Sequence, residues 1–369
     1  MNPQILYELA EILTLRDYET KARARLDEAT WAYLAGGAGD EITLEDNMRA
    51  FDRWRIVPRV LADFAQASTA VRLFGRTFAH PVFVAPTAYH RLFDPEGEHA
   101  TAQGAAAAES GMVLSAMAGI PLEQAAEHYG KGLWLQCYMQ QDRGAAQHLC
   151  ERAEAAGYEA LVLTVDAPLH CFRYREQRAG FQLPSGMEAI NLRGFHSHQA
   201  DSRVFGGDLL KRAPGWRDVE WLCSITRLPV LLKGILSPAD ARTALTCGAR
   251  GVIVSNHGGR VLDGVPAAFD ALPDIAAAVG DSLVVMMDGG IRRGMDVCKA
   301  LARGADAVLL GRPVLHSLAC FGALGVAHCL RTLHTEIEAV MAIIGAPTLA
   351  DLKTAELIPA PLSQWIRRV

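Results

Sequence analysis

The sequence predicts an α/β protein whose strands close into a (β/α)8 barrel, and three observations support this fold class. Short apolar runs recur along the chain, most of them starting 21 to 32 residues apart. They are continuously apolar rather than alternating, as parallel strands buried on both faces should be. Helix-like stretches separate them, in the order of parallel βαβ units. The eight expected strands cover residues 82–85, 112–114, 133–137, 161–165, 230–232, 251–254, 283–287 and 307–310.

The remaining elements fit around such a barrel as one domain spanning 1–369. Residues 1–60 are expected to form a helical extension, with helices over 7–15 and 18–34, and residues 80–345 to form the barrel. Alanine-rich stretches of helical period lie between the strands, each followed by a glycine typical of a helix end. These stretches are 97–110, 143–156, 238–247 and 295–303.

Two segments depart from the strand–helix alternation. The fourth and fifth strands start 69 residues apart, and the polar, glycine-rich residues 166–215 between them predict a long lid loop. After the last strand, residues 314–344 predict a helix, followed by an irregular C-terminal tail.

Composition and charge exclude several functional classes. Lys and Arg total 36 and Asp and Glu 41, so the net charge of −5 gives no basic field for nucleic acid or an anionic membrane. The eight cysteines form no CxxC pair, so neither a structural metal site nor any other metal site is expected. No secretory signal or membrane span is expected, and buried free thiols favour a cytoplasmic protein.

Polar or glycine residues follow every predicted strand. In a barrel enzyme the carboxyl ends of the strands carry the chemistry, so these residues are expected to meet at one rim. After the last two strands, glycine-rich turns precede helix starts, which indicates an anion cradle strengthened by Arg292 and Arg312. The residues at the strand ends include Pro86, Ser115, Gln136, Tyr138, Thr164, Asp166, Lys233, Ser255, His257, Asp288 and Gly311.

Two of these strand ends suggest catalysis. Lys233 is compatible with a Schiff-base nucleophile, a fixed positive charge or a solvated lysine. His257 lies beside an asparagine and two glycines and near Arg260, which makes it a candidate acid or base next to an anion clamp. Asp166, from another strand end, is placed to orient its imidazole.

Motifs spread over most of the chain resemble those of the FMN-dependent α-hydroxy-acid oxidase and dehydrogenase family, whose members include glycolate oxidase, lactate oxidase and mandelate dehydrogenase. SNHGGR at 255–260 is the most specific of them. The others, in family order, are LAGGAGDE (34–41), APTA (85–88), LTVDAP (163–168), LPVLLKG (228–234), DGGIRRG (288–294) and LLGRP (309–313).

This resemblance implies FMN as the cofactor and a role for each matching residue. Lys233 would stabilise the reduced flavin, Asp288 would hold the ribityl hydroxyls, and His257 would be the base paired with Asp166. Tyr33, Arg173 and Arg260 would bind the substrate carboxylate, and Tyr138 its hydroxyl or carboxylate. The implied cofactor-binding set is Ala85, Pro86, Thr87, Ala88, Ser115, Gln136, Thr164, Lys233, Ser255, Asp288, Gly289, Gly290, Arg292, Gly311 and Arg312.

Most departures from the family pattern concern the substrate. Met117 stands where glycolate oxidase has a pocket tryptophan, and Tyr89-His90 resembles a pair in hydroxymandelate-oxidase-like members. Val261 replaces a common glutamine, which concerns the support of the arginine rather than the substrate. Unusual residues, including Phe172, precede Arg173 in the lid. These departures suggest a 2-hydroxy acid with a larger or aromatic side chain.

Three functions remain open on the sequence. The first is an L-2-hydroxy-acid oxidase that passes electrons to O2 and makes H2O2. The second is a dehydrogenase of the same family that uses a quinone or cytochrome; the polar loop at 166–215 and the lack of a haem domain favour the oxidase. The third is a flavin-binding barrel without turnover. The resemblance also implies a homotetramer.

Overall fold

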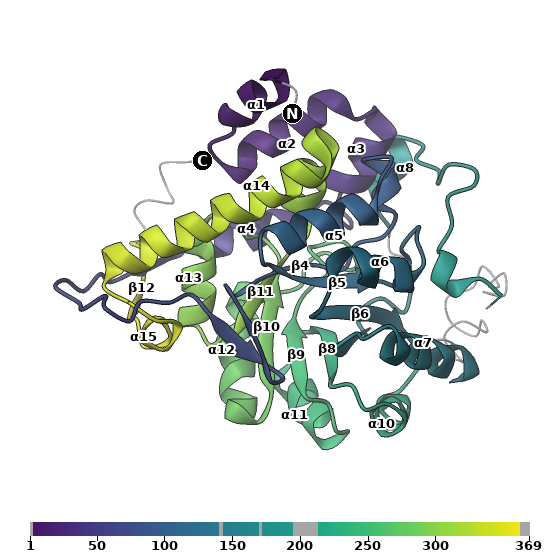
Figure 1. Cartoon of the computed structure of the whole chain (residues 1–369). Helices are drawn as coiled ribbons and strands as arrows, with labels where there is room; N and C mark the ends of the chain where they lie inside the picture. The colour runs from purple at the N-terminus through teal and green to yellow at the C-terminus, as the bar shows by residue number, and fades with distance from the viewer. Residues whose placement is uncertain (1–2, 140–142, 170–171, 195–212, 362–369) are drawn as a thin grey trace.

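A closed barrel of eight parallel strands forms the centre of the molecule (Figure 1). The computed structural model describes residues 3–139, 143–169, 172–194 and 213–361. Every predicted strand is present, and the order around the barrel is β10-β11-β4-β5-β6-β7-β8-β9. The strands are β4 (Val82–Val84), β5 (Gly111–Ser115), β6 (Leu133–Tyr138), β7 (Ala160–Thr164), β8 (Val230–Ile235), β9 (Gly251–Val254), β10 (Val284–Asp288) and β11 (Ala307–Leu310). Because β8 continues to Ile235, Lys233 lies within the strand rather than after it.

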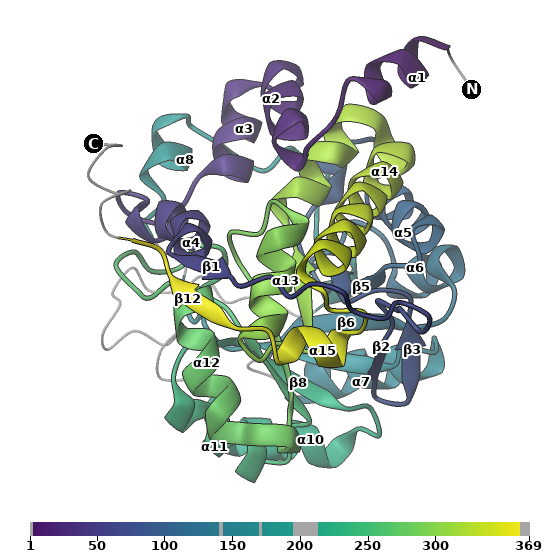
Figure 2. The same cartoon turned by 90° about the vertical axis from the view of Figure 1, so that its left-hand side faces the viewer.

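Helices surround the barrel and connect its strands, so that Figures 1 and 2 show them on its outside. They include the helical stretches predicted between and after the strands, with boundaries shifted by up to three residues. The helices that follow successive strands are α5 (Glu98–Ala107), α6 (Leu122–Tyr129), α7 (Arg143–Ala155), α8 (Tyr174–Arg178), α10 (Trp216–Ile225), α11 (Pro238–Thr246), α12 (Ala268–Val279), α13 (Gly294–Ala302) and α14 (Arg312–Ile344).

The N-terminal extension contains more helices than the two expected. They are α1 (Pro3–Ala10), α2 (Leu15–Arg25), α3 (Glu28–Ala35) and α4 (Ile42–Asp52). The predicted helix over 18–34 is split because Asp27 caps a new helix, its side chain accepting a hydrogen bond from the Thr30 N–H at 2.9 Å. The expectation of one continuous helix was therefore wrong, and the cap residue is the physical reason.

The C-terminal tail was predicted to be irregular, but part of it is ordered into a helix and a strand. Helix α15 (Leu349–Lys353) is followed by β12 (Leu357–Pro359), which pairs antiparallel with β1 (Trp54–Ile56). This pairing joins the tail to the end of the N-terminal extension (Figure 2). Neither strand was expected, because each is only three residues long and its pairing is formed across the whole chain.

Helix α14 is the one helix in the described part of the chain that is long and apolar enough to cross a membrane. Two-thirds (67%) of its most apolar window is buried inside the protein. It packs on α5 and α2, and its backbone leaves helical geometry at Phe321 and Gly322. Burial in the core therefore accounts for its composition.

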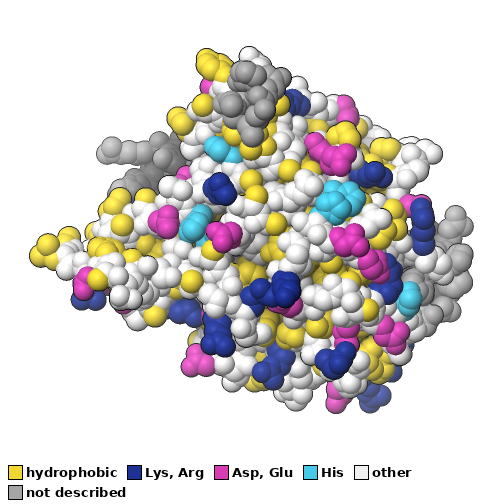
Figure 3. All heavy atoms as spheres, in the orientation of Figure 1, with side chains coloured by type: hydrophobic (Ala, Val, Ile, Leu, Met, Phe, Trp, Pro, Cys, Tyr) yellow, Lys and Arg dark blue, Asp and Glu magenta, His cyan; other side chains and the backbone are white. Residues whose placement is uncertain are grey.

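The amino ends of the strands are closed by an aromatic cluster. The hairpin of β2 (Val71–Leu73) and β3 (Arg76–Phe78) packs against the barrel interior, where the Phe83 and Trp134 rings lie 4.8 Å apart. Gly111 leaves room for Phe83, since a Cβ there would lie 2.2 Å from its ring. On the outside, Figure 3 shows acidic and basic side chains interspersed over the face drawn.

The predicted lid is only partly described. Its described residues contain α8 and a 3-10 turn, Ile190–Leu192. Residues 170–171 and 195–212 of this segment lie outside the described part of the chain.

Candidate active site

One cavity of about 1100 Å³ lies at the carboxyl ends of the strands and brings together most of the predicted site residues. All of them except Asp166 and Ser255 line it. The lining members of the predicted set are Tyr33, Ala85, Pro86, Thr87, Ala88, Ser115, Gln136, Tyr138, Thr164, Arg173, Lys233, His257, Arg260, Asp288, Gly289, Gly290, Arg292, Gly311 and Arg312.

His257 and Asp166 form a hydrogen-bonded pair at the wall of this cavity. The Nδ1 atom of His257 lies 3.0 Å from Oδ1 of Asp166. Burial alone would raise the pKa of Asp166, but the hydrogen bond with His257 and the nearby charge of Lys233 hold it below its usual range. An ionised carboxylate only accepts hydrogen bonds, so His257 carries its proton on Nδ1 and leaves Nε2 as a base.

The backbone around this pair is shaped to bring it together. Gly234 has a φ of +107°, and a Cβ there would lie 2.4 Å from the Cβ of Asp166. His257 itself adopts a φ of +58°, a strained conformation for a residue other than glycine. Its backbone N–H donates to Oγ of Ser255 at 3.0 Å, which helps to hold that conformation. Ser255 thus lies behind the cavity wall, where its hydroxyl holds the backbone of His257 in place.

Lys233 is a buried cation with two defined partners. Its Nζ lies 2.8 Å from Oδ2 of Asp288 and donates to Oγ of Ser255 at 2.8 Å. Burial opposes its charge, but Asp288 and Asp166 outweigh burial and raise the pKa of Lys233. Of the three roles that the sequence left open, this environment favours a fixed positive charge, because a Schiff-base nucleophile needs a neutral amine.

A row of polar side chains crosses three neighbouring strands. Ser115 donates to Oε1 of Gln136 at 3.0 Å, and Nε2 of Gln136 donates to Oγ1 of Thr164 at 3.0 Å. Ser115 and Gln136 are directly paired in the parallel register. All three side chains line the cavity, so the row presents hydrogen-bonding groups in fixed positions to its interior.

Two arginines and two tyrosines form a cationic corner. Arg260 donates to the carbonyls of Tyr33 at 2.7 Å and Gly36 at 3.0 Å, and its guanidinium lies 5.2 Å from the Tyr33 ring centroid. Arg173 and Tyr138 line the same cavity. Burial raises the pKa of both tyrosines, so they stay protonated and able to donate.

The turns after β10 and β11 form the other end of the cavity. Gly290 has a φ of +82°, and a Cβ there would lie 2.0 Å from the carbonyl oxygen of Asn47. Burial lowers the pKa of Arg292 and Arg312, which indicates cationic groups without enough negative charge around them. Arg312 donates to the carbonyls of Leu34, Gly36 and Gly258 at 2.9 to 3.1 Å.

Sequence reasoning missed Glu176, which lines the cavity beside the arginines. Its carboxylate accepts from Nη1 of Arg173 at 2.6 Å and lies 4.0 Å from Nη2 of Arg260. The spacing of three residues between Arg173 and Glu176 could have indicated this ion pair, because residues three apart are neighbours on the surface of a helix. Tyr89 and Met117, the departures that suggested a larger substrate, also line the cavity, and so does Met139, to which no role was assigned.

Comparison with known proteins agrees with this geometry. The family model described as FMN-dependent dehydrogenase matches residues 22–359. The chain is 44% identical over 356 residues to an L-lactate oxidase of Nostoc sp., covering 94% of this chain and 98% of the relative. It is 40% identical over 357 residues to glycolate oxidase 1 of Zea mays, covering 95% and 96%.

A solved structure of a mandelate oxidase variant with (S)-mandelic acid superposes with a TM-score of 0.88 at 39% identity, covering 95% of this chain and 100% of that one. The matches extend over nearly the whole chain, and the family motifs coincide with the cavity wall. The chain therefore belongs to the FMN-dependent dehydrogenase family and is an FMN-dependent oxidoreductase acting on 2-hydroxy acids.

Proposed function

We propose that the protein is an L-2-hydroxy-acid oxidase that converts a 2-hydroxy acid and O2 to the 2-oxo acid and H2O2. The observation that carries this proposal is the position of the His257–Asp166 pair and the Arg260 corner on the same cavity as the cofactor-binding motifs. The names of the similar proteins, L-lactate oxidase, glycolate oxidase and mandelate oxidase, support an oxidase.

The cavity walls fit FMN. Oδ1 of Asp288 is buried and, among the described residues, has no hydrogen-bond partner, so it can accept from a ribityl hydroxyl. Nε of Arg292 is likewise buried without a hydrogen bond and can donate to a phosphate. Gly289 and Gly290, in the turn after β10, and Gly311 and Arg312, at the start of α14, line the same end of the cavity and can present backbone N–H groups to the phosphate.

The polar row and its neighbours would hold the flavin ring. Ser115, Gln136 and Thr164 would hydrogen-bond its polar edge, and residues 85–88 would pack along it. Lys233 would supply a fixed positive charge beside it, supported by Ser255. When bound, FMN accepts the two electrons that the substrate loses.

The chain's own residues would bind the substrate and take up its proton. Arg260, Arg173 and Tyr33 would hold the carboxylate, since guanidinium groups bind carboxylates with directed, charge-assisted hydrogen bonds. Nε2 of His257 would then take the hydroxyl proton, and Asp166 would stabilise the imidazolium that results. Tyr138 would donate a hydrogen bond to the substrate hydroxyl or carboxylate.

The proposed substrate carries a side chain larger than that of glycolate. Tyr89, Met117 and Met139 line the cavity, and methionine adapts readily to apolar groups of irregular shape. The complex of a mandelate oxidase variant with (S)-mandelic acid supports an aromatic substrate, and the lactate oxidase relatives support a small aliphatic one.

A panel of 2-hydroxy acids, from glycolate to mandelate, tests the function. Substrate should bleach the FMN absorbance under anaerobic conditions, and oxygen should restore it with one H2O2 per turnover. Bleaching that only a quinone or cytochrome reverses would make the protein a dehydrogenase. A yellow protein that no 2-hydroxy acid bleaches would be a flavin-binding barrel without this activity.

We also propose that the protein is a cytoplasmic homotetramer. The cysteines within the described residues are unpaired, as suits a reducing compartment. Val60, Leu61 and Phe64 of the connector between β1 and β2, and Ile343 of α14, are exposed at 80%, 100%, 40% and 74%. Apolar side chains this exposed favour burial against further subunits. Size-exclusion chromatography with light scattering would test the tetramer.

A further inference from the structure

We propose that Glu176 occupies the carboxylate-binding position of the clamp in the ligand-free enzyme and is displaced by the substrate's carboxylate. This inference rests on the proposed function of Arg173 and Arg260. It makes Glu176 a residue that sets the affinity and selectivity of the site for carboxylates.

The position of the Glu176 carboxylate carries the proposal. Oε2 accepts a hydrogen bond from Nη1 of Arg173 at 2.6 Å and lies within ion-pair distance of Nη2 of Arg260, at 4.0 Å, so one oxygen interacts with both guanidiniums. The three side chains are 18 to 21% exposed, and all three residues line the main cavity. A substrate carboxylate that bound both arginines would need this same space.

The electrostatics of the corner explain why a side-chain carboxylate is held there. Burial and the charge of Arg173 both lower the pKa of Arg260, and Glu176 opposes them. Two partly buried cations without a counter-ion are unfavourable, so an internal carboxylate stabilises the empty site. Substrate binding then replaces the ion pair of Glu176 with the arginines by one between the substrate carboxylate and the arginines. The net gain in binding free energy is smaller than for arginines without a partner.

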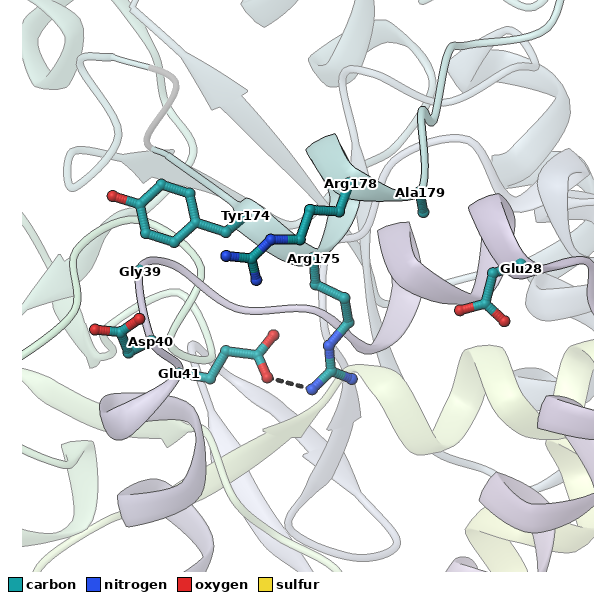
Figure 4. A pocket seen from close by; sticks show the side chains of 8 residues that line it. All are labelled: Glu28, Gly39, Asp40, Glu41, Tyr174, Arg175, Arg178 and Ala179. Carbon is teal, nitrogen blue, oxygen red and sulfur yellow. Dashed lines mark hydrogen bonds and ion pairs between the residues drawn. The ribbon is translucent and has the colours of Figure 1, made fainter.

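Contacts of the lid keep Glu176 in this place. Arg175 forms an ion pair with Glu41, which Figure 4 shows across a smaller cavity of about 460 Å³ between α8 and the loop before α4. The Gly39 N–H donates to the carbonyl of Phe172 at 2.9 Å. The Phe181 ring stacks on Tyr33, with centroids 4.4 Å apart. These contacts hold both ends of α8, so displacing the Glu176 carboxylate would move its side chain rather than the helix.

Ligand binding to the FMN-loaded enzyme tests the proposal without turnover. Pyruvate and benzoylformate are titrated, and the change in FMN absorbance gives a dissociation constant for each. In Glu176→Gln the isosteric amide removes the competing charge, so both constants should fall roughly tenfold. Glu188→Gln is the matched control, because it removes the same charge from an exposed ion pair with Arg193 in the same loop. Its constants should stay within about twofold of the wild type.

The outcomes separate the two hypotheses. Unchanged or weaker binding in Glu176→Gln would overturn the displacement proposal, because it would mean that Glu176 only orients Arg173. An equal gain in Glu188→Gln would also overturn it, because the effect would then be general electrostatics. Arg260→Lys is measured in parallel and should weaken binding of both ligands. If it leaves their constants unchanged, the carboxylate clamp of the proposed function is wrong.

Discussion

A histidine lies at each end of the barrel, and the two are held in opposite ways. His80, at the amino end, is fully buried, and both of its nitrogens have partners: Nδ1 accepts from the Val82 N–H at 3.3 Å, and Nε2 donates to the Ala108 carbonyl at 3.0 Å. His257, at the carboxyl end, uses Nδ1 for Asp166 and lines the cavity. Both ring nitrogens of His80 are therefore hydrogen-bonded within the fold, whereas Nε2 of His257 is left to interact with a ligand.

The surroundings of the two histidines differ in the same way. Near the amino end, Phe78, Phe83 and Trp134 fill the barrel with apolar contacts. At the carboxyl end, Asp166 and Asp288 each keep one buried oxygen without a partner among the described residues. Unsatisfied polar groups destabilise a fold, so their concentration at one end marks the end that binds ligands. Substitutions at the two ends should therefore affect different properties.

His257→Gln should have the largest effect, and on catalysis alone. Loss of a general base costs about 10²- to 10⁴-fold in rate, because no group then takes the substrate proton. FMN should remain bound, since the cofactor-binding residues are untouched. Anaerobic stopped-flow absorbance with a 2-hydroxy acid measures the rate of FMN reduction, and the absorbance spectrum reports bound FMN. Reduction at the wild-type rate would remove His257 from its assigned role.

Trp134→Ala should have the largest effect on stability. Trp134 is 1% exposed and contacts Phe74, Phe78 and Phe83, so its truncation leaves a cavity that the barrel cannot close. The free energy of unfolding should fall by about 3–5 kcal/mol. Denaturant unfolding of the FMN-loaded protein measures it, with Trp216→Ala, a 38% exposed tryptophan on α10, as control. An equal loss of unfolding free energy in both variants would show that the aromatic cluster at the amino end contributes no more to stability than an exposed tryptophan.

The same contrast explains what the sequence could predict. The eight barrel strands were found because each is an apolar run whose neighbours are set by local alternation with helices. Strands β1 and β12 were missed because Trp54 pairs with Pro359 across the whole chain, which no local pattern records. The break at Leu26-Asp27 was missed because the apolar period continues through a helix cap.

For the site, the sequence positions predicted which residues gather at one rim of the barrel, but not the hydrogen-bond and ion-pair partners of each side chain. Strand ends in parallel register bring Ser115, Gln136 and Thr164 together, so their convergence followed from the fold class. The role of Lys233 stayed open because its ion pair with Asp288 depends on side chains from two strands. Glu176 was missed because its approach to Arg260 depends on where α8 lies in the folded protein, which the local sequence does not show.

The pH dependence of stability should come partly from His80. Burial lowers its pKa to about 4, against an ordinary value near 6.5. The unfolded chain therefore binds a proton below pH ~6.5 that the folded chain refuses until pH ~4, and stability is lost as the pH falls through this window, by roughly 3 kcal/mol. Denaturant unfolding of wild type and His80→Gln from pH 7 to pH 4 measures it. Their stability difference should shrink as the pH falls, and a constant difference would contradict the assignment.

The smallest effect is expected from the ion pair that fastens the hairpin over the amino end. Arg76 donates to both carboxylate oxygens of Glu159, with side chains 32% and 29% exposed. Partly exposed pairs contribute little because water screens them, so Arg76→Gln should lower the free energy of unfolding by about 0.5–1 kcal/mol. High salt should reduce the difference from wild type. A loss as large as that of Trp134→Ala would mean that charge, rather than apolar packing, holds the amino end closed.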